Sequence, residues 1–258
     1  HWSPQGQSTT QRRAMASFIK RHDPYRHPVL IHTHSTSEEK TSILSPLLGF
    51  KDIDGLSFQV GDPTRVNREV RLWREAAMRA GHPWLITMDE IGPWQRGAVP
   101  DADEHDDHKV LRREVLWGSL LGGAAGVEWY FGAHFPHNDL TAENWRTRGS
   151  LWKQSRTAAE FFETLPLVDM APCTRTKVAY CLAEPGKLYV AYRNAGQALS
   201  LDLNGVPGEF DVRWFNPIQG GELVVSGLER TRGDQIVVLD SPPDRDVDWV
   251  AVVTRRSN

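Results

Sequence analysis

The sequence predicts an α/β region followed by an all-β domain, and three observations support this fold class. Before about residue 170, short apolar runs alternate with longer stretches of helical periodicity, which is typical of repeated βα units. After that point the helical period disappears and short β-rich runs follow one another. Turn sequences such as Asn204-Gly205 separate these runs. We therefore expect two domains, at residues 1–168 and 169–258.

The α/β region contains four predicted strands and four predicted helices. The run Trp84–Met88 is almost continuously apolar, as expected for a parallel strand that is covered on both faces. In the helix over 66–77, apolar residues recur at spacings of four, three and four, and Gly81 stands where a C-terminal cap belongs. The predicted strands are 28–31, 56–59, 84–88 and 127–131, and the predicted helices extend from a cap among Ser8–Thr10 to before Pro24, over 66–77, over 111–122 and over 150–165.

The all-β domain contains seven predicted strands and no helix, which is what a small antiparallel β-sandwich requires. The region holds both cysteines, Cys173 and Cys181, which are too few for a disulfide scaffold or a Cys-rich zinc site. We expect them to be buried free thiols. The predicted strands are 177–183, 187–193, 198–204, 209–215, 222–226, 235–240 and 247–254.

The net charge and the apolar content of the sequence exclude some classes of binding partner. A formal net charge of -3 provides no basic field, so we expect neither nucleic acid nor a membrane surface as a partner. No apolar run approaches the roughly 20 residues of a membrane span. The first residues lack the pattern of a signal peptide, but the chain begins at His1 and we expect a truncated or processed sequence, which leaves localisation open. Ten tryptophans favour a carbohydrate ligand slightly, because flat aromatic faces suit sugar rings.

Four successive βα units fit either an open doubly wound sheet or half of a closed barrel, and the pattern alone does not separate the two. Several sequence blocks carry a family resemblance: Thr9–Met15, Asp23-Pro24, Gly81–Pro93, Arg112–Gly118, Gly122–Gly132, Glu209–Pro217, Gly220-Gly221 and Asp248–Val250. Together they resemble bacterial glycoside-hydrolase-like barrels of the domain-of-unknown-function type that end in a "putative collagen-binding" sandwich. The resemblance implies that the four strands are strands five to eight of a TIM (β/α)8 barrel.

In such barrels the site forms at the carboxyl ends of the strands, so the polar and aromatic residues that follow each apolar run are candidates. Side chains alternate along a strand, so we expect only one of Asp89 and Glu90 to point fully into the site. The resemblance selects Glu90, which matches the family's strand-seven nucleophile. The alternative is that Glu90 caps a loop or pairs with an arginine such as Arg96. The candidates at strand ends are His32, His34, Gln59, Asp89, Glu90, Trp129, Tyr130 and His134.

The expected ligand is a carbohydrate substrate. Trp94, Trp129 and Tyr130 either stack on sugar rings or fill the barrel core, and the sequence favours neither alternative. Asn138 and Asp139 suit hydroxyl recognition and turn formation equally.

Metal ligation is the less favoured role for the histidines. His32-Thr-His34 and the acidic run Asp103–His108 contain suitable ligand types, but both motifs are short. A histidine at a strand end of a sugar site more often bonds a hydroxyl group. We therefore expect no metal and no cofactor, and we expect His34 to contact substrate.

A glycosidase needs a second carboxyl group, and here the chain departs from the family pattern. The related barrels carry an acidic Gly-Glu-Glu-Asn-like motif after strand four, where this chain has Ser3–Gln7. The predicted function is thus a retaining glycoside hydrolase with Glu90 as nucleophile and an acid/base from outside the chain. The alternative is a non-catalytic carbohydrate-binding or attachment protein with a degenerate cleft. A half-barrel exposes open edges, so we also expect the chain to self-associate.

Overall fold

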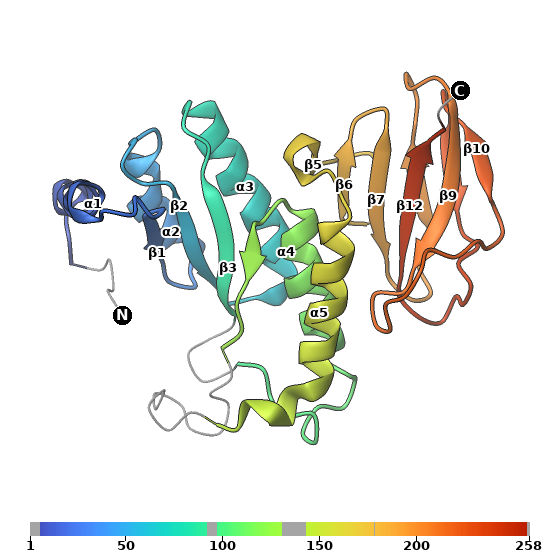
Figure 1. The fold of residues 1–258 in the computed structure, drawn as a ribbon, viewed down its shortest axis with the longest axis horizontal. Coiled ribbons are helices and arrows are strands. Elements are labelled where there is room, and N and C mark those ends of the chain that lie inside the picture. The colour runs from blue at the N-terminus through green and yellow to red at the C-terminus, as the bar shows by residue number, and fades with distance from the viewer. Residues whose placement is uncertain (1–5, 92–96, 131–142, 178, 257–258) are drawn as a thin grey trace. The chain divides into compact units, whose positions relative to one another are not determined.

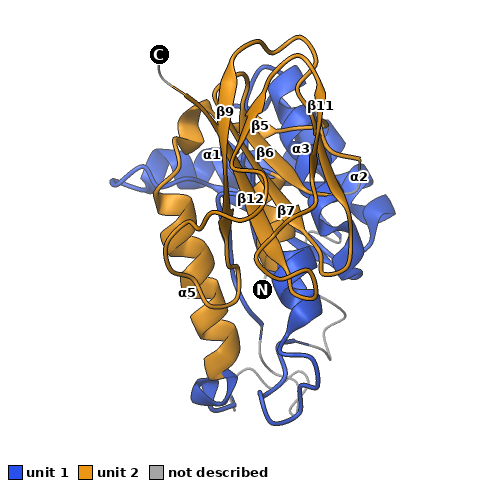
Figure 2. Cartoon of the chain, turned by 90° about the vertical axis from the view of Figure 1, so that its right-hand side faces the viewer, with its two compact units in different colours: residues 1–115, 123–148 blue, residues 116–122, 149–258 orange. Residues whose placement is uncertain are grey.

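The protein is described by a computed structural model that covers residues 6–91, 97–130, 143–177 and 179–256 (Figure 1). The chain divides into two compact units (Figure 2). The first comprises residues 1–115 and 123–148, and the second comprises residues 116–122 and 149–258. One parallel sheet and two antiparallel sheets make this a mixed α/β fold, as the sequence predicts. No helix within the described residues is both long and apolar enough to cross a membrane.

The first unit is built on a four-stranded sheet with the order β1-β2-β3-β4, in which every neighbouring pair is parallel (Figure 1). The largely buried strand β2 and the buried residues Ile86, Met88 and Ile91 of β3 form one core with the helices, in which Trp73 of α3 is almost fully buried. The strands are β1 (Leu30–His32), β2 (Gly55–Val60), β3 (Leu85–Ile91) and β4 (Gly126–Val127). The helices are α1 (Thr9–His22), α2 (Ser37–Leu44) and α3 (Val66–Arg79), with 3-10 turns at Ser45–Leu47, Pro63–Arg65 and Trp145–Arg148.

Helix α1 begins where its sequence predicts. The Ser8 hydroxyl accepts a bond from Gln11 N at 3.2 Å, and Ser8 N donates to the Gln11 side chain at 2.8 Å, so the two residues form a capping box. The apolar side of this helix is only partly covered, since Met15 and Ile19 remain 39% and 40% exposed. Gly81, after α3, has φ 77° and occupies the predicted C-terminal cap.

Helix α2 is not predicted by the sequence. Its segment Ser37–Leu44 has little amphipathic periodicity, because Lys40 is buried together with the apolar residues Ile43 and Leu44. Two glutamates occupy the first turn, where the helix dipole favours negative charge. The periodicity of apolar residues therefore does not predict this helix, because one residue of its buried face is charged.

The second unit contains two antiparallel sheets, of order β10-β9-β12-β7-β6-β5 and β11-β8. Both sheets contribute to a single core around Trp214. Helix α5 (Gly149–Glu163) joins this unit through Trp117, whose ring lies 5.4 Å from Phe161 and 5.5 Å from Tyr192. The strands are β5 (Ala171–Pro172), β6 (Cys181–Glu184), β7 (Leu188–Arg193), β8 (Leu199–Asp202), β9 (Glu209–Phe215), β10 (Arg230–Arg232), β11 (Ile236–Leu239) and β12 (Trp249–Arg255). The remaining helical segments are the π-helix Leu111–Trp117, α4 (Gly118–Leu121) and the 3-10 turn Leu167–Asp169.

The predicted strand at 222–226 is wrong. That run makes only an isolated bridge between Val224 and Trp214, and Val225 is 50% exposed. On the side of β9 away from β12, the paired strand is instead β10, whose sequence Arg-Thr-Arg has no apolar alternation. An edge strand with two exposed side chains does not need that alternation, which explains the error.

The expectation of free thiols is also wrong. Cys173 and Cys181 form a disulfide, with their Cα atoms 5.1 Å apart. Antiparallel pairing of β5 with β6 brings the two cysteines together, and Cys173 N donates to Cys181 O at 2.8 Å. Counting cysteines in the sequence could not show that a hairpin would bring the pair into contact.

Candidate active site

Three of the predicted site residues meet at the carboxyl edge of the parallel sheet. β1 ends at His32, β2 carries Gln59 and β3 carries Glu90. The Gln59 side-chain amide donates to Glu90 Oε1 at 3.0 Å, and His32 Nε2 lies 3.7 Å from Glu90 Oε2. Since the strands are parallel and adjacent, their carboxyl ends fall at one edge, and this places a carboxylate between an amide and an imidazole.

Ser57 belongs to the same cluster, although sequence analysis did not select it. Its hydroxyl lies 3.0 Å from His32 Nδ1. This bond fixes the ring so that the other nitrogen faces Glu90. Ser57 stands two residues before Gln59 and so shares its face of the strand, which is the sequence feature that could have identified it.

A β-bulge changes the expected alternation on β3. The register pairs Phe58 with Met88 and then Gln59 with Glu90, so Asp89 is the extra residue. Asp89 accepts a bond from the Thr87 hydroxyl at 3.0 Å, while Glu90 accepts from Gln59. Thr87 pairs with Ser57, which shares a face with Gln59, so the bulge places both carboxylates on one face. The expectation that only one of them could point into the site is therefore wrong.

The surroundings of His32 favour its neutral form. Burial lowers the pKa of His32, and His34 lowers it further, while the negative charge of Asp89 acts in the opposite direction. His34 is half-buried and lies close enough to act on His32 electrostatically. A neutral imidazole next to a carboxylate can donate or accept a hydrogen bond without adding a charge to the site.

Strand β4 brings Trp129 and Tyr130 towards this edge, and both are half-buried. Trp129 packs against the core of the first unit, so part of its surface is used for packing. The backbone carbonyl of Tyr130 accepts a bond from Ala98 N at 2.7 Å. The other four predicted contacts, Trp94, His134, Asn138 and Asp139, lie outside the described residues, as does Arg96.

The segment after β3 is anchored by a buried arginine. Arg148 donates through Nε to the Ala98 carbonyl at 2.9 Å and forms an ion pair with Glu143, while its side chain is 1% exposed. Gly97 lies where an added Cβ would stand 2.1 Å from the Tyr130 carbonyl oxygen. Gly97 and Ala98 are thereby held against the backbone of Tyr130 and the side chain of Arg148. Arg148 stands in a polar stretch with no motif, so the sequence offered no reason to select it.

The acidic run that suggested a metal site has another arrangement. The buried His108 contacts Asp101 at 2.9 Å through Nε2 and lies 3.6 Å from Glu104 through Nδ1. Within the described ranges of the chain, no group of three or more His, Cys, Asp and Glu side chains is arranged to hold a metal ion. His108 therefore links its own loop through hydrogen bonding.

The fold, a parallel βα sheet followed by antiparallel sheets, is similar to that of solved glycoside hydrolase structures. A solved structure named "Glycoside hydrolase" is similar with a TM-score of 0.60 and 13% identity, over 97% of this chain and 70% of that chain. A glycoside hydrolase family 5 protein from Bacteroides vulgatus ATCC 8482 is similar with a TM-score of 0.58 and 15% identity, over 95% of this chain and 66% of that chain. At these identities the likeness concerns the fold alone.

The sequence itself matches one family, described as "Putative collagen-binding domain of a collagenase", over residues 170–254. This match covers the antiparallel strands β5 to β12 and leaves β1 to β4 outside it. No curated protein matches the sequence.

Proposed function

We propose that this chain is part of a glycoside hydrolase that cleaves O-glycosidic bonds of a poly- or oligosaccharide, with Glu90 as the nucleophile. The observation that carries the proposal is the convergence of His32 and Gln59 on Glu90 at the carboxyl edge of parallel strands. That edge is where active sites of βα barrels form. The glycoside hydrolase names of the similar structures agree with it.

In the proposed reaction one oxygen of Glu90 attacks the anomeric carbon as the bond to the leaving oxygen breaks. The leaving oxygen takes a proton from an acid that lies outside this chain. Water then attacks the anomeric carbon of the glycosyl-enzyme ester, its proton passes to the same outside group, which now acts as a base, and the Glu90 carboxylate is released. Gln59 binds one carboxylate oxygen at 3.0 Å, which orients the other oxygen for attack.

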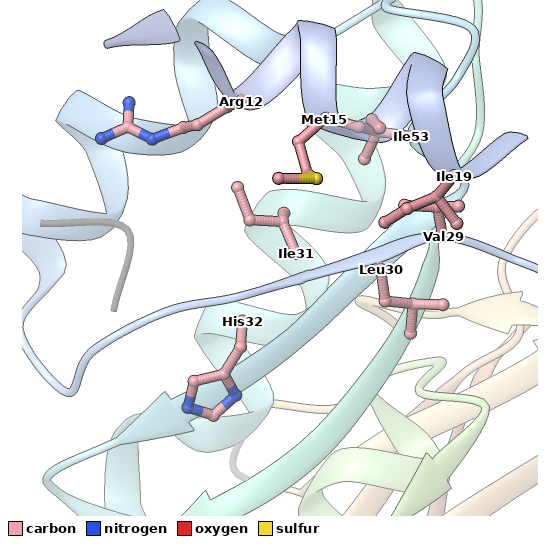
Figure 3. A pocket seen from close by; sticks show the side chains of 9 residues that line it. Arg12, Met15, Ile19, Val29, Leu30, Ile31, His32 and Ile53 are labelled. Carbon is pink, nitrogen blue, oxygen red and sulfur yellow. The ribbon is translucent and has the colours of Figure 1, made fainter. Parts of the chain in front are cut away.

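We further propose that β1 to β4 are strands five to eight of a (β/α)8 barrel, in a domain of residues 1–168 followed by a sandwich domain of residues 169–258. A pocket of about 370 Å³ between α1 and the edge strand β1 supports this (Figure 3). Met15 and Ile19 of α1 and Ile31 of β1 line it, and all three are apolar. A parallel strand of a further βα unit would cover these side chains and pair with β1, which is the edge strand of the sheet that the described residues form.

Sugar binding is assigned to the parallel-sheet unit. Within the described part of the second unit, every exposed large hydrophobic side chain is aliphatic, for example Val225 and Ile236. Stacking on sugar rings requires exposed aromatic faces. The residues 170–254 therefore fit an accessory role better than a sugar platform.

The experiment is active-site labelling of a protein in which the missing barrel half has been restored. A 2-deoxy-2-fluoro glycoside traps the glycosyl ester, and mass spectrometry should place the label on the peptide containing Glu90. In the same protein Glu90→Gln should lower turnover by several orders of magnitude with folding retained, while Asp89→Asn does less harm. Label on another residue, or full activity in Glu90→Gln, would remove Glu90 from the mechanism. Sugar binding without turnover would favour the non-catalytic alternative.

A further inference from the structure

Behind the site lies a buried ion pair that the proposed reaction does not use. Lys40 of α2 and Glu69 of α3 are in contact, and their side chains are 0% and 4% exposed. Burial lowers the pKa of Lys40, and the hydrogen bond that Lys40 donates to Glu69 opposes this shift. Buried ion pairs contribute little net stability, because desolvation offsets their attraction. This pair therefore calls for an explanation other than stability alone.

The ammonium group of Lys40 binds the backbone at the ends of two strands. It donates to the Gln59 carbonyl at 2.8 Å and to the Ser35 carbonyl at 3.4 Å. Gln59 is on β2, and Ser35 follows β1 three residues after His32. One charge thus connects the segments that carry His32 and Gln59, two residues that lie next to Glu90.

Glu69 holds Lys40 in this position through further contacts. The Ser37 hydroxyl donates to Glu69 Oε1 at 2.8 Å, and Arg65 Nη2 donates to the Ser37 hydroxyl at 2.5 Å. Lys40 Nζ also lies over the ring of Phe58, 5.5 Å from its centroid. These contacts hold the Lys40 ammonium in one position, next to the carbonyl groups of Gln59 and Ser35.

We propose that Lys40 is a positioning residue, held by Glu69, that fixes the ends of β1 and β2 so that His32 and Gln59 contact Glu90. Its catalytic consequence rests on the proposed function of Glu90. The positioning itself is a property of the free protein and can be measured without any substrate.

The test is NMR spectroscopy of the full chain, with the Gln59 side-chain amide as the reporter. In the native protein these signals should shift as Glu90 gains its proton, because Gln59 Nε2 donates to that carboxylate. The variant Glu90→Gln identifies the response, since it has no carboxylate to titrate. In the double variant Lys40→Met with Glu69→Leu, we expect the response to fall to about half or less, because a hydrogen bond weakens steeply when its geometry is lost.

The double variant replaces the pair by apolar side chains of similar volume, which is often neutral for stability. The second variant is Lys40→Gln with Glu69→Gln. The side chain of glutamine at position 40 is shorter than that of lysine and cannot reach both the Gln59 and the Ser35 carbonyl groups. The matched control is Lys20→Met, which removes a lysine–carboxylate pair with Asp54 at 2.5 Å. Asp54 accepts a hydrogen bond from Val29 N, which lies just before the amino end of β1, so this pair is away from the carboxyl edge of the sheet. In this control the Gln59 signals should therefore shift with pH as they do in the native protein.

The proposal would be overturned if the Gln59 signals of either folded double variant shifted with pH as much as those of the native protein. It would also be overturned if the Gln59 signals of the native protein did not change with pH. If neither variant folds, the pair serves stability and the proposal is wrong. In the barrel-completed protein the double variant should lower kcat by about 10–100-fold with KM changed by about twofold or less, since small misplacements of reacting groups have effects of this size. Absence of turnover in the native protein would reject the proposed function and leave the NMR result as the test of Lys40.

Discussion

Gln59 donates a hydrogen bond to Glu90 at 3.0 Å across a β-bulge between adjacent strands. The carboxylate therefore accepts a hydrogen bond from the neighbouring strand β2. The bulge also places Asp89 on the same face, so the edge of the sheet carries two carboxylates and the imidazole of His32, whose pKa is lowered by burial. This arrangement leads to specific expectations for pH, packing and assembly.

Acid should destabilise the protein partly through His32. Burial lowers the pKa of His32 in the folded chain, so below about pH 6.5 the unfolded chain takes up the proton first. The free energy of unfolding then falls until the pH passes below the folded pKa. His32→Gln should make the dependence of the melting temperature on pH shallower in this range. Asp89→Asn should make it steeper, because Asp89 raises the pKa of His32, and equal slopes in all three proteins would contradict the assignment.

Gly97→Ala should destabilise the segment after β3. A Cβ at this position would stand 2.1 Å from the Tyr130 carbonyl oxygen, and backbone cannot move aside as a flexible side chain can. We expect a loss of roughly 1–3 kcal/mol or more in the free energy of unfolding, as for overpacking. Denaturant unfolding followed by circular dichroism would measure it. Gly126→Ala is the control, since its Cβ would be 4.0 Å from Thr87 Cγ2, and a similar loss in both variants would refute the steric reason.

The disulfide should stabilise the second unit. It closes a loop with a sequence separation of 8, for which loop-closure entropy predicts roughly 2–3 kcal/mol. Cys173→Ala with Cys181→Ala should therefore lower the unfolding midpoint of this unit, and a reducing agent should lower that of the native chain but not of the variant. Thiol titration of the unreduced, denatured chain should find no free thiol within this pair. Two reactive thiols in that experiment would count against the bond.

The chain by itself should self-associate through the edge of β1. Met15 and Ile19 are 39% and 40% exposed beside the pocket at that edge, and open parallel edges pair readily. Light scattering after size-exclusion chromatography should show a mass above that of the monomer. Met15→Glu with Ile19→Lys should shift it towards the monomer, whereas Met78→Lys, an exposed change on α3 outside the pocket lining, should not. A native chain that stays monomeric at high concentration would contradict the prediction.

Limited proteolysis should cut first in the exposed segment that precedes β5. Val168 is 99% exposed and Leu167 is 46% exposed, so a protease that cleaves after aliphatic residues can reach this backbone. The paired strands β7, β9 and β12 should resist longer, because their backbone groups are held in one sheet. Mass spectrometry of the first fragments would locate the cut. A first cut within Glu209–Phe215 would contradict the expected boundary between the domains.

The sequence alone determined those features that depend on neighbouring residues along the chain. The capping box of Ser8 and Gln11, the Gly81 cap and the buried strand before Glu90 all follow from local patterns of polarity and backbone freedom. Parallel strand order then implied that His32, Gln59 and Glu90 would meet at one edge, and the structure brings these three together.

Only the tertiary structure decided the contacts that depend on pairing between distant segments. The bulge that turns Asp89 to the face of Glu90 is a property of register, and the disulfide depends on how β5 pairs with β6. Helix α2 was not predicted because its buried face includes Lys40, and a lysine in a sequence is normally expected at the surface. A lysine can be buried there only because the fold brings Glu69 to it, and no spacing in the sequence encodes that pairing.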